Sequence, residues 1–221
     1  MKYLHFLLIA TFSLFSYSAQ AQFSLGIKGG YTLAWPDYGT VVLPEYAETA
    51  VNGVNGGLIL SYRISNRISI NADPSYVQRG AACEPGWQPI FAADSRLLLD
   101  YVELPVMISF NQPVFHNKWN VSLKAGYGFS KIVSAHREEF FISSSKTVYR
   151  TKLDLDDPFS TSIVKTDHGA YGGLSVGYNL TFGSIFFEST YYHGMKNVDT
   201  ENFLKNNSVN FNFGYIVSLC N

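Results

Sequence analysis

The sequence predicts an all-β protein, an eight-stranded antiparallel up-and-down β-barrel that spans a membrane. Three observations predict this fold: alternation of apolar and polar residues, an abundance of aromatic residues, and loops that alternate between long and short. The alternation is clearest at 119–129, where the apolar face carries Trp119, Val121, Leu123, Ala125, Tyr127 and Phe129. Because a strand sends successive side chains to opposite faces, one face suits lipid and the other, small and polar, suits a narrow barrel interior.

Seven further segments show the same alternation, and each is assigned to a strand on that ground. In chain order the eight segments span 23–35, 54–64, 68–79, 101–110, 119–129, 167–180, 185–192 and 208–219. Their apolar faces include, in the same order, Ile27, Leu58, Ile70, Ile108, Leu123, Leu174, Phe187 and Phe213. Their polar faces include Lys28, Gly57, Asn71, Ser109, Ser122, Ser175, Glu188 and Asn212. At about 3.3 Å per residue and a tilt of about 40°, a strand of about ten residues reaches about 25 Å, the height of the apolar band of such barrels.

The connections run long, short, long, short, long, short, long. The long ones are 36–52, 80–96, 133–166 and 196–206, and the short ones lie at 65–67, 111–118 and 181–184. Outer-membrane barrels join strands by short periplasmic turns and longer extracellular loops, so both chain ends are expected on the inner side. The centre of the longest loop, 140–152, is expected to prolong a hairpin into solvent. Pro74 and Pro105 lie within strands, where each removes a ladder donor, and predict β-bulges.

Composition and targeting signals agree with export to an outer membrane. The chain has 15 tyrosines, 17 phenylalanines and 18 glycines, which suit aromatic girdles outside a barrel and small residues inside it. Lys2, the apolar stretch 4–17 and a small-residue cleavage site at Ala21 predict a signal peptide over 1–21, followed by a barrel domain over 22–221. The net charge of −1 argues against nucleic-acid binding. No later apolar run has the length of a spanning helix.

Two soluble folds are the structural alternatives. A β-sandwich would cover the apolar face with a second sheet, but sandwiches space their turns more evenly than this chain does. A lipocalin-like barrel would place the large apolar residues inside, whereas the glycine-bearing face here is too thin to line such a cup. An eight-stranded barrel is just wide enough for side chains to fill, so we expect no open pore.

Several short motifs, taken in order, resemble the outer membrane protein beta-barrel domain family of Bacteroidota-type Gram-negative bacteria, which includes the PorT-like proteins. The motifs lie at 26–30 (GIKGG), 71–76 with Gly80, 101–105 (YVELP), 125–128 (AGYG), 167–169 and 191–194. The resemblance implies an eight-stranded outer-membrane barrel, and most members have no assigned activity. The family often has an arginine before the tyrosine of the seventh strand, where this chain has Thr190.

Ionisable residues on or beside the predicted inner faces form the main candidate site, an interior charge network of Lys28, Asp73, Arg79, Glu103, Lys124 and Glu188. In the hairpin of the fourth and fifth strands, Glu103 is expected near Lys124 or Gly126. Buried charges need partners, so we interpret the set as paired charges that fill a narrow barrel. The alternative interpretation is a path for protons or ions.

Two histidines raise an enzymatic hypothesis. His168 and His193 are expected near the outer ends of neighbouring strands, close to Asp167, Ser189 and Glu188. Outer-membrane lipid A deacylases are also small barrels, and they use a histidine, a serine and a carboxylate within hydrogen-bond reach. We predict instead a protein that is not an enzyme, with no catalytic, cofactor-binding or metal site.

The predicted function is therefore structural or surface-binding. We expect a monomer in the cell outer membrane, whose long outer loops bind an extracellular ligand. Its expected partners are outer-membrane lipid and, during insertion, the barrel-assembly machinery. The alternative, which the PorT-like resemblance implies, is an accessory role in protein secretion or envelope assembly, and the third hypothesis is a lipid A-modifying enzyme.

Overall fold

The computed structural model of the protein describes residues 23–37, 46–85, 94–142, 146–156, 162–199 and 204–219. The predicted signal peptide, 1–21, lies outside the described residues. Within them, the chain forms eleven β-strands that pair antiparallel. The strands are β1 (Phe23–Asp37), β2 (Tyr46–Thr49), β3 (Val51–Arg63), β4 (Ile68–Ala72), β5 (Ser75–Pro85), β6 (Asp94–Val114), β7 (Trp119–Ile142), β8 (Lys146–Lys152), β9 (Thr166–Leu180), β10 (Gly183–Gly194) and β11 (Lys205–Ser218).

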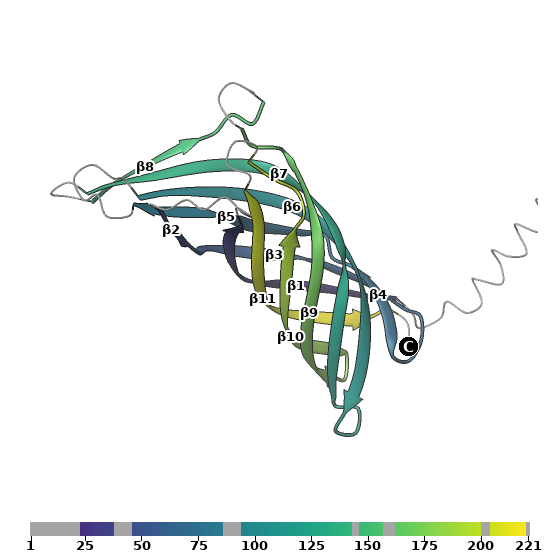
Figure 1. The fold of residues 1–221 in the computed structure, drawn as a ribbon. Coiled ribbons are helices and arrows are strands. Elements are labelled where there is room, and N and C mark those ends of the chain that lie inside the picture. Colours follow the sequence, from purple (N-terminus) through teal and green to yellow (C-terminus); the bar gives the residue numbers. More distant parts are fainter. Residues whose placement is uncertain are drawn as a thin grey trace, which may run out of the picture.

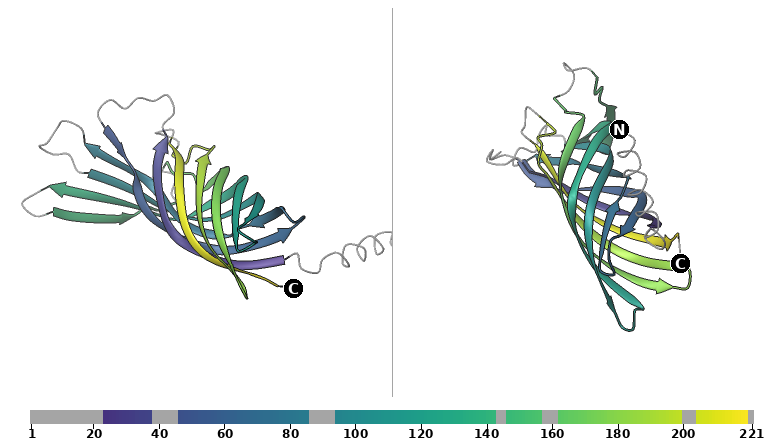
Figure 2. Two further views of the ribbon diagram at one scale, coloured as in Figure 1. Left: turned by 90° about the horizontal axis from the view of Figure 1, so that it is seen from below. Right: turned by 90° about the vertical axis from the view of Figure 1, so that its right-hand side faces the viewer.

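The strands close into a ring (Figure 1). β1 pairs with β3 on one side and with β11 on the other, and the ring continues through β4 and β5, then β6, β7, β9 and β10. The prediction of an eight-stranded antiparallel barrel is confirmed. The first and last strands, β1 and β11, begin and end on the side of the short connections, where the Leu219 backbone N–H donates to the carbonyl oxygen of Phe23 at 2.9 Å (Figure 2, left).

The ring has eight positions, and nine of the eleven strands form it. β2 pairs only with β5, and β8 folds back along β7, from His136↔Lys152 to Ile142↔Lys146. This pairing is the predicted prolongation of the hairpin at 140–152. β4 and β5 together form one ring strand, which is interrupted at 73–74.

The two prolines within strands do not produce the expected bulges. β4 and β5 pair with β6 in one register, and Pro105 lies opposite Gly128 without a shift. Both prolines keep a carbonyl that accepts a backbone hydrogen bond, from Leu58 to Pro74 at 3.0 Å and from Asp73 to Pro105 at 3.1 Å. The register shift between β6 and β7 lies elsewhere, at Asp100/Tyr101.

The hairpin of β6 and β7 also corrects the sequence-based register. Its turn contains three residues with positive φ, Phe115, His116 and Asn117, so β6 continues to Val114 instead of ending near 110. Glu103 therefore pairs with Ser130, and Lys124 pairs with Ser109. The expected neighbourhood of Glu103 with Lys124 or Gly126 is wrong, because the turn is centred about two residues later than predicted.

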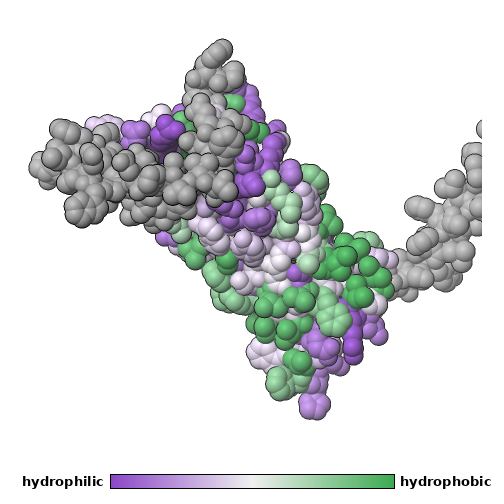
Figure 3. Space-filling model, in the orientation of Figure 1, coloured by the Kyte–Doolittle hydropathy of each residue, from purple (hydrophilic) through white to green (hydrophobic). Residues whose placement is uncertain are grey.

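The outer face of the ring carries an apolar belt. Ile27, Leu123 and Phe213 are 61%, 59% and 71% exposed, and aromatic rings border the belt at both ends. At the inner end, Phe23 packs on Tyr62 and Trp119 on Tyr178, with centroids 4.9 and 5.0 Å apart; at the outer end, the aromatic contacts are Trp35–Tyr191 and Tyr127–Phe129. Figure 3 shows the apolar side chains gathered over the lower barrel. Such a belt with two girdles is the surface of a transmembrane barrel. In the described segments, no helix has the length and apolarity to span a membrane.

Part of the sheet continues beyond this belt. β6 begins at Asp94 and β7 ends at Ile142, so both strands extend well past Asp100 and Lys131, where exposed charged residues replace the apolar ones. The outer parts of β5, β6 and β7, together with β2 and β8, form what we call the projecting sheet (Figures 1 and 2). The predicted loops 36–52, 80–96, 133–166 and 196–206 are thus partly strand, since strands enter all four ranges.

Cysteine labelling checks this topology. In a background with Cys83→Ser and Cys220→Ser, we expect Thr151→Cys on β8 to react with an impermeant maleimide on intact cells. Asn66→Cys, in the short turn between β3 and β4, should react only after the outer membrane is opened. Labelling of Asn66→Cys on intact cells, with Thr151→Cys protected, would invert the orientation.

Candidate functional site

The interior of the barrel has three zones. An apolar cluster lies at the outer end, ion pairs fill the middle, and a polar cavity occupies the inner end. The zones follow from the sequence of each strand, because inward positions change from serine and asparagine to charged and then to apolar residues. β7 shows the series along its length: Ser122, Lys124 and Ser130 are followed by Ile132 and Ala135.

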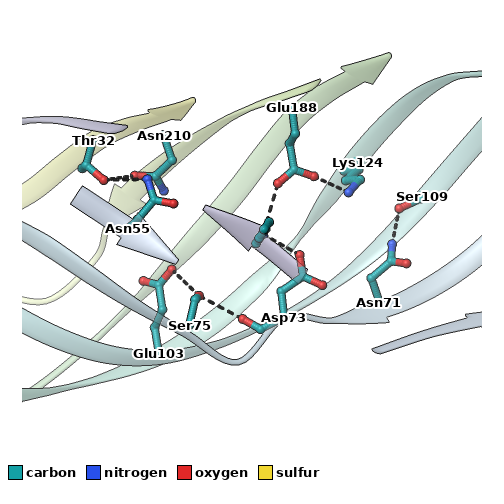
Figure 4. Close-up of polar contacts among 11 residues, drawn as sticks. Thr32, Asn55, Asn71, Asp73, Ser75, Glu103, Ser109, Lys124, Glu188 and Asn210 are labelled. Carbon is teal, nitrogen blue, oxygen red and sulfur yellow. Dashed lines mark hydrogen bonds and ion pairs between the residues drawn. The ribbon is translucent and has the colours of Figure 1, made fainter. Parts of the chain in front are cut away.

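Four charged side chains form a continuous series of ion pairs across the middle zone (Figure 4). Lys28 Nζ lies 2.7 Å from Asp73 Oδ2 and 3.1 Å from Glu188 Oε1, and Lys124 pairs with the other oxygen of Glu188. The residues come from β1, the 73–74 interruption, β7 and β10, so the pairs connect opposite walls of the ring. Each side chain is at most 9% exposed.

The remaining pair of the network lies nearer the outer end. Arg79 Nη2 is 2.5 Å from Glu103 Oε2, and both side chains are buried. Tyr171 donates its hydroxyl to the same glutamate oxygen at 2.8 Å, and Arg79 Nε donates to Ser208 at 3.1 Å. The guanidinium carbon also lies 4.0 Å from the ring centroid of Tyr192, a cation–π contact.

The structure brings all six predicted residues into ion pairs, and a hydroxyl connects the two groups. Ser75 Oγ lies 3.0 Å from the carbonyl oxygen of Asp73 and 3.3 Å from Glu103 Oε1 (Figure 4). Three cations balance three anions, as buried charges require. Beside them, Asn55, Thr32 and Asn210 form a neutral chain of hydrogen bonds, 3.0 and 2.9 Å long. Such an interior holds side chains from opposite walls of the ring together.

Sequence reasoning missed the tyrosines of this site. Tyr171, Tyr101 and Tyr192 are buried inside the barrel, and the Tyr171 ring lies against Gly128, where an added Cβ would approach it to 2.7 Å. Glycine on the inner face of β7 therefore makes room for a tyrosine from β9. The available signal was that Tyr171 is the only large residue on a face that otherwise carries glycine and serine from 169 to 177.

The outer end of the interior is closed by apolar packing. Leu99, Tyr101 and Ile132 from β6 and β7 contact residues from the outer connections, namely Ile163, Val198 and Leu204. Isolated bridges join Asp199 to Ile163 and to Leu204, so segments before β9 and β11 lie across this end. Among the described residues, the outer mouth is thus covered by buried side chains.

The inner end is open and polar. A cavity of about 370 Å³, which we call the inner vestibule, is lined by 23 residues, of which nine are serines and six are asparagines. Its base includes Lys124 of the ion-pair network, and its rim includes the short turn at 65–66. The barrel is therefore a cup that is closed on the outside and opens toward the side of the chain ends.

The structure separates the residues of the enzymatic hypothesis. Glu188 is buried inside the barrel with two lysines, whereas His168 Nδ1 contacts the Tyr127 hydroxyl at 2.5 Å on the outer face. His193 Nδ1 lies 2.8 Å from Asn207 Oδ1, so the partner of this histidine is an amide and not the carboxylate that the enzymatic hypothesis needs. In the described ranges, no three His, Cys, Asp or Glu side chains gather as a metal site would need.

The closed ring, the apolar belt and the two girdles define an integral membrane β-barrel of the outer-membrane class. The sequence profile of the outer membrane protein beta-barrel domain family matches residues 18–200, and the chain belongs to this family. Its placement in the outer membrane follows from that membership. No curated protein is significantly similar in sequence.

Solved structures of outer-membrane proteins are similar to the chain at low sequence identity. Neisserial surface protein A (NspA) is 13% identical, with a TM-score of 0.50 over 89% of this chain and 97% of that chain. OprG from Pseudomonas aeruginosa is 11% identical, with a TM-score of 0.48 over 90% and 97%. Ail from Yersinia pestis is 12% identical, with a TM-score of 0.42 over 88% and 99%. At these identities the likeness concerns the fold alone.

Proposed function

We propose that the protein is a non-enzymatic, monomeric outer-membrane barrel that recognises a partner at the cell surface. One observation carries this proposal: strands continue beyond the apolar belt as the projecting sheet, while the interior behind it is filled by ion pairs and an apolar cluster. A barrel that only anchored itself in lipid would not need strands beyond the belt. A pore would need a hydrated interior, which the packed middle zone does not offer.

The edge of the projecting sheet supports recognition by strand addition. Within the described chain, β8 pairs with β7 alone, so its other edge has unpaired backbone groups that a partner strand could use. Arg150 and Lys152 on β8 are exposed, and Arg150 Nε is 3.8 Å from Glu138. Glu138 compensates the charge of Arg150, so Lys152 is the positive charge on β8 that favours an extended partner segment with acidic side chains.

Trimming the hairpin tests this proposal. Replacement of 138–150 by Asn-Gly retains the pair Arg137↔Thr151 and closes it with a tight turn. On an array of extracellular proteins and glycans, we expect wild-type barrel in lipid nanodiscs to bind at least one component. The trimmed barrel should bind it about tenfold or more weakly, the loss expected for a central contact of an interface.

Two controls separate recognition from folding. Both barrels should show the same heat-dependent shift on gel electrophoresis, and neither should raise the ion conductance of a planar bilayer. Equal binding by wild-type and trimmed barrels, or no binding by either, would contradict surface recognition through this hairpin. A steady conductance step would favour the ion-path interpretation of the interior.

The second candidate function is an accessory role in secretion or envelope assembly, as in PorT-like proteins. The observation that favours it is the inner vestibule, which opens toward the periplasmic side. Copurification of secretion or assembly components with the trimmed barrel as well as with wild type would support this role. We do not propose a lipid A-modifying activity, because His168 and His193 lie on the outer face of the barrel wall and Glu188 lies on its inner face. The expected result is that lipid A is unchanged in cells that express the protein.

A further inference from the structure

The inner vestibule has the chemistry of a binding site that the proposed surface function does not use. It lies at the end of the barrel opposite the projecting sheet, and it contains about 370 Å³ of free space. Small-molecule sites in proteins begin at about 300 Å³. Unlike most of them, this one is lined mainly by hydroxyl and amide groups.

Hydrogen bonds between neighbouring strands hold these polar groups in place. Asn111 Nδ2 donates to Ser69 Oγ at 3.0 Å, Ser122 Oγ donates to Asn111 Oδ1 at 2.7 Å, and Asn120 Nδ2 donates to Ser122 Oγ at 3.0 Å. A serine oxygen has two lone pairs and an asparagine amide has two donors, so each retains capacity for a ligand. The wall therefore offers closely spaced donors and acceptors whose positions are fixed before a ligand arrives.

The charged and apolar residues that line the inner vestibule indicate which class of ligand it could bind. Among the described residues, the charged ones that line the vestibule are Arg63 and Lys124, both cationic, and no carboxylate of this part of the chain lines it. Glu188 neutralises part of the Lys124 charge, whereas Arg63 is exposed at the rim. Phe186 and Ile216 add apolar surface beside these polar groups. A ligand that fits presents many hydroxyls, one flat C–H face and a negative charge.

We propose that the inner vestibule binds a small acidic sugar from the periplasm, an N-acetylated pyranose that carries a carboxylate. Ring hydroxyls and the acetamido group would meet the serine and asparagine wall, and a C–H face of the ring would lie on Phe186. The carboxylate would lie toward Arg63. An acyl chain would leave the wall groups unpaired, which excludes a lipid tail as the occupant.

A matched pair of glycine variants tests occupancy of the cavity. Gly177 lines the vestibule, and an added Cβ there would meet its nearest atoms at an ordinary 3.5 and 3.6 Å; Gly172, on the outer face of the same strand, has nothing within 4 Å. We expect N-acetylmuramic acid to give saturation-transfer NMR signals with the full-length folded wild-type barrel. Gly172→Tyr should retain these signals, and Gly177→Tyr should abolish them because its ring fills the cavity.

A second pair tests the role of charge. Arg63→Gln should weaken the binding of N-acetylmuramic acid by about threefold, the effect of an exposed ion pair, and leave N-acetylglucosamine unchanged. Arg67→Gln, in the turn that follows β3 but outside the lining, is the control. Absence of binding to the wild-type barrel, or binding that survives Gly177→Tyr, would overturn the proposal. Surface recognition would be unaffected by any of these variants, so failure of one proposal is distinguishable from failure of the other.

Discussion

Leu123→Arg is expected to destabilise the folded barrel in a membrane by about 2–4 kcal/mol, whereas Ser122→Arg has a much smaller effect. Leu123 is 59% exposed and lies midway between Trp119 and Tyr127, the girdle residues of β7. An arginine on the lipid face near the bilayer midplane costs about 2–4 kcal/mol. Total stabilities of folded domains are only about 5–15 kcal/mol, so this is a large share.

The adjacent position provides the control, because the same substitution one residue away projects to the other face. Ser122 lines the inner vestibule, where an arginine reaches water and polar groups. Urea titration of refolding into lipid vesicles, followed by tryptophan fluorescence, measures both variants. Equal loss of stability in the two would mean that the register of β7 is displaced by one residue, since such a slip exchanges the faces.

Arg79→Met is expected to destabilise the barrel by about 3–5 kcal/mol, because it leaves Glu103 buried without its cation. Tyr171 still donates to Glu103, but one neutral donor does not replace a guanidinium at 2.5 Å. The measurement is again the free energy of unfolding in vesicles. Asp156→Asn, which removes an exposed ion pair with Lys165, should have no measurable effect.

The double variant Arg79→Met with Glu103→Gln distinguishes a broken pair from a packing defect. Removal of both charges should recover much of the stability that the single variant loses, because no uncompensated charge remains inside. A double variant that is as unstable as the sum of the two single variants would refute direct coupling between Arg79 and Glu103. In that case the contacts of Arg79 with Ser208 and Tyr192 would account for the effect.

The lipid-facing surface was predictable from the sequence because period-two alternation is a local property. Leu123 and Ser122 face lipid and interior as the pattern indicates, and the inward positions of Lys28, Glu103 and Glu188 follow from the same rule. The ion-pair partners across the barrel were not predictable. Alternation shows which face of the strand a residue lies on, but it does not show the height of that residue along the barrel axis. The position of the β6–β7 turn decides which inward residues lie at the same height in the barrel, and the positive φ of Phe115 is not recognisable from its residue type.

The sequence pattern also did not predict how far the strands continue beyond the apolar belt. Alternation of apolar and polar residues indicates a strand with one face that is buried or contacts lipid. The projecting sheet is exposed to water over much of its surface, so its strands lack this alternation. Segments such as Asp94–Asp100 therefore look like loop in the sequence although they pair residue by residue in the structure. The contacts of Arg79 with Ser208 of β11 and Tyr192 of β10 were hidden as well, because these strands meet β5 only when the ring closes.

The seam between β1 and β11 constrains the order in which the chain folds. Fourteen residue pairs join these strands, and Ser24 and Ser218, whose hydroxyls are 3.3 Å apart, are separated by 194 positions in the sequence. Contacts between residues so far apart form slowly, because loop closure must precede any gain from pairing. Until β11 is in place, β1 retains an open edge, and Lys28 lacks Glu188 from β10. A chain truncated before β11 would therefore remain an open sheet prone to pair with other copies.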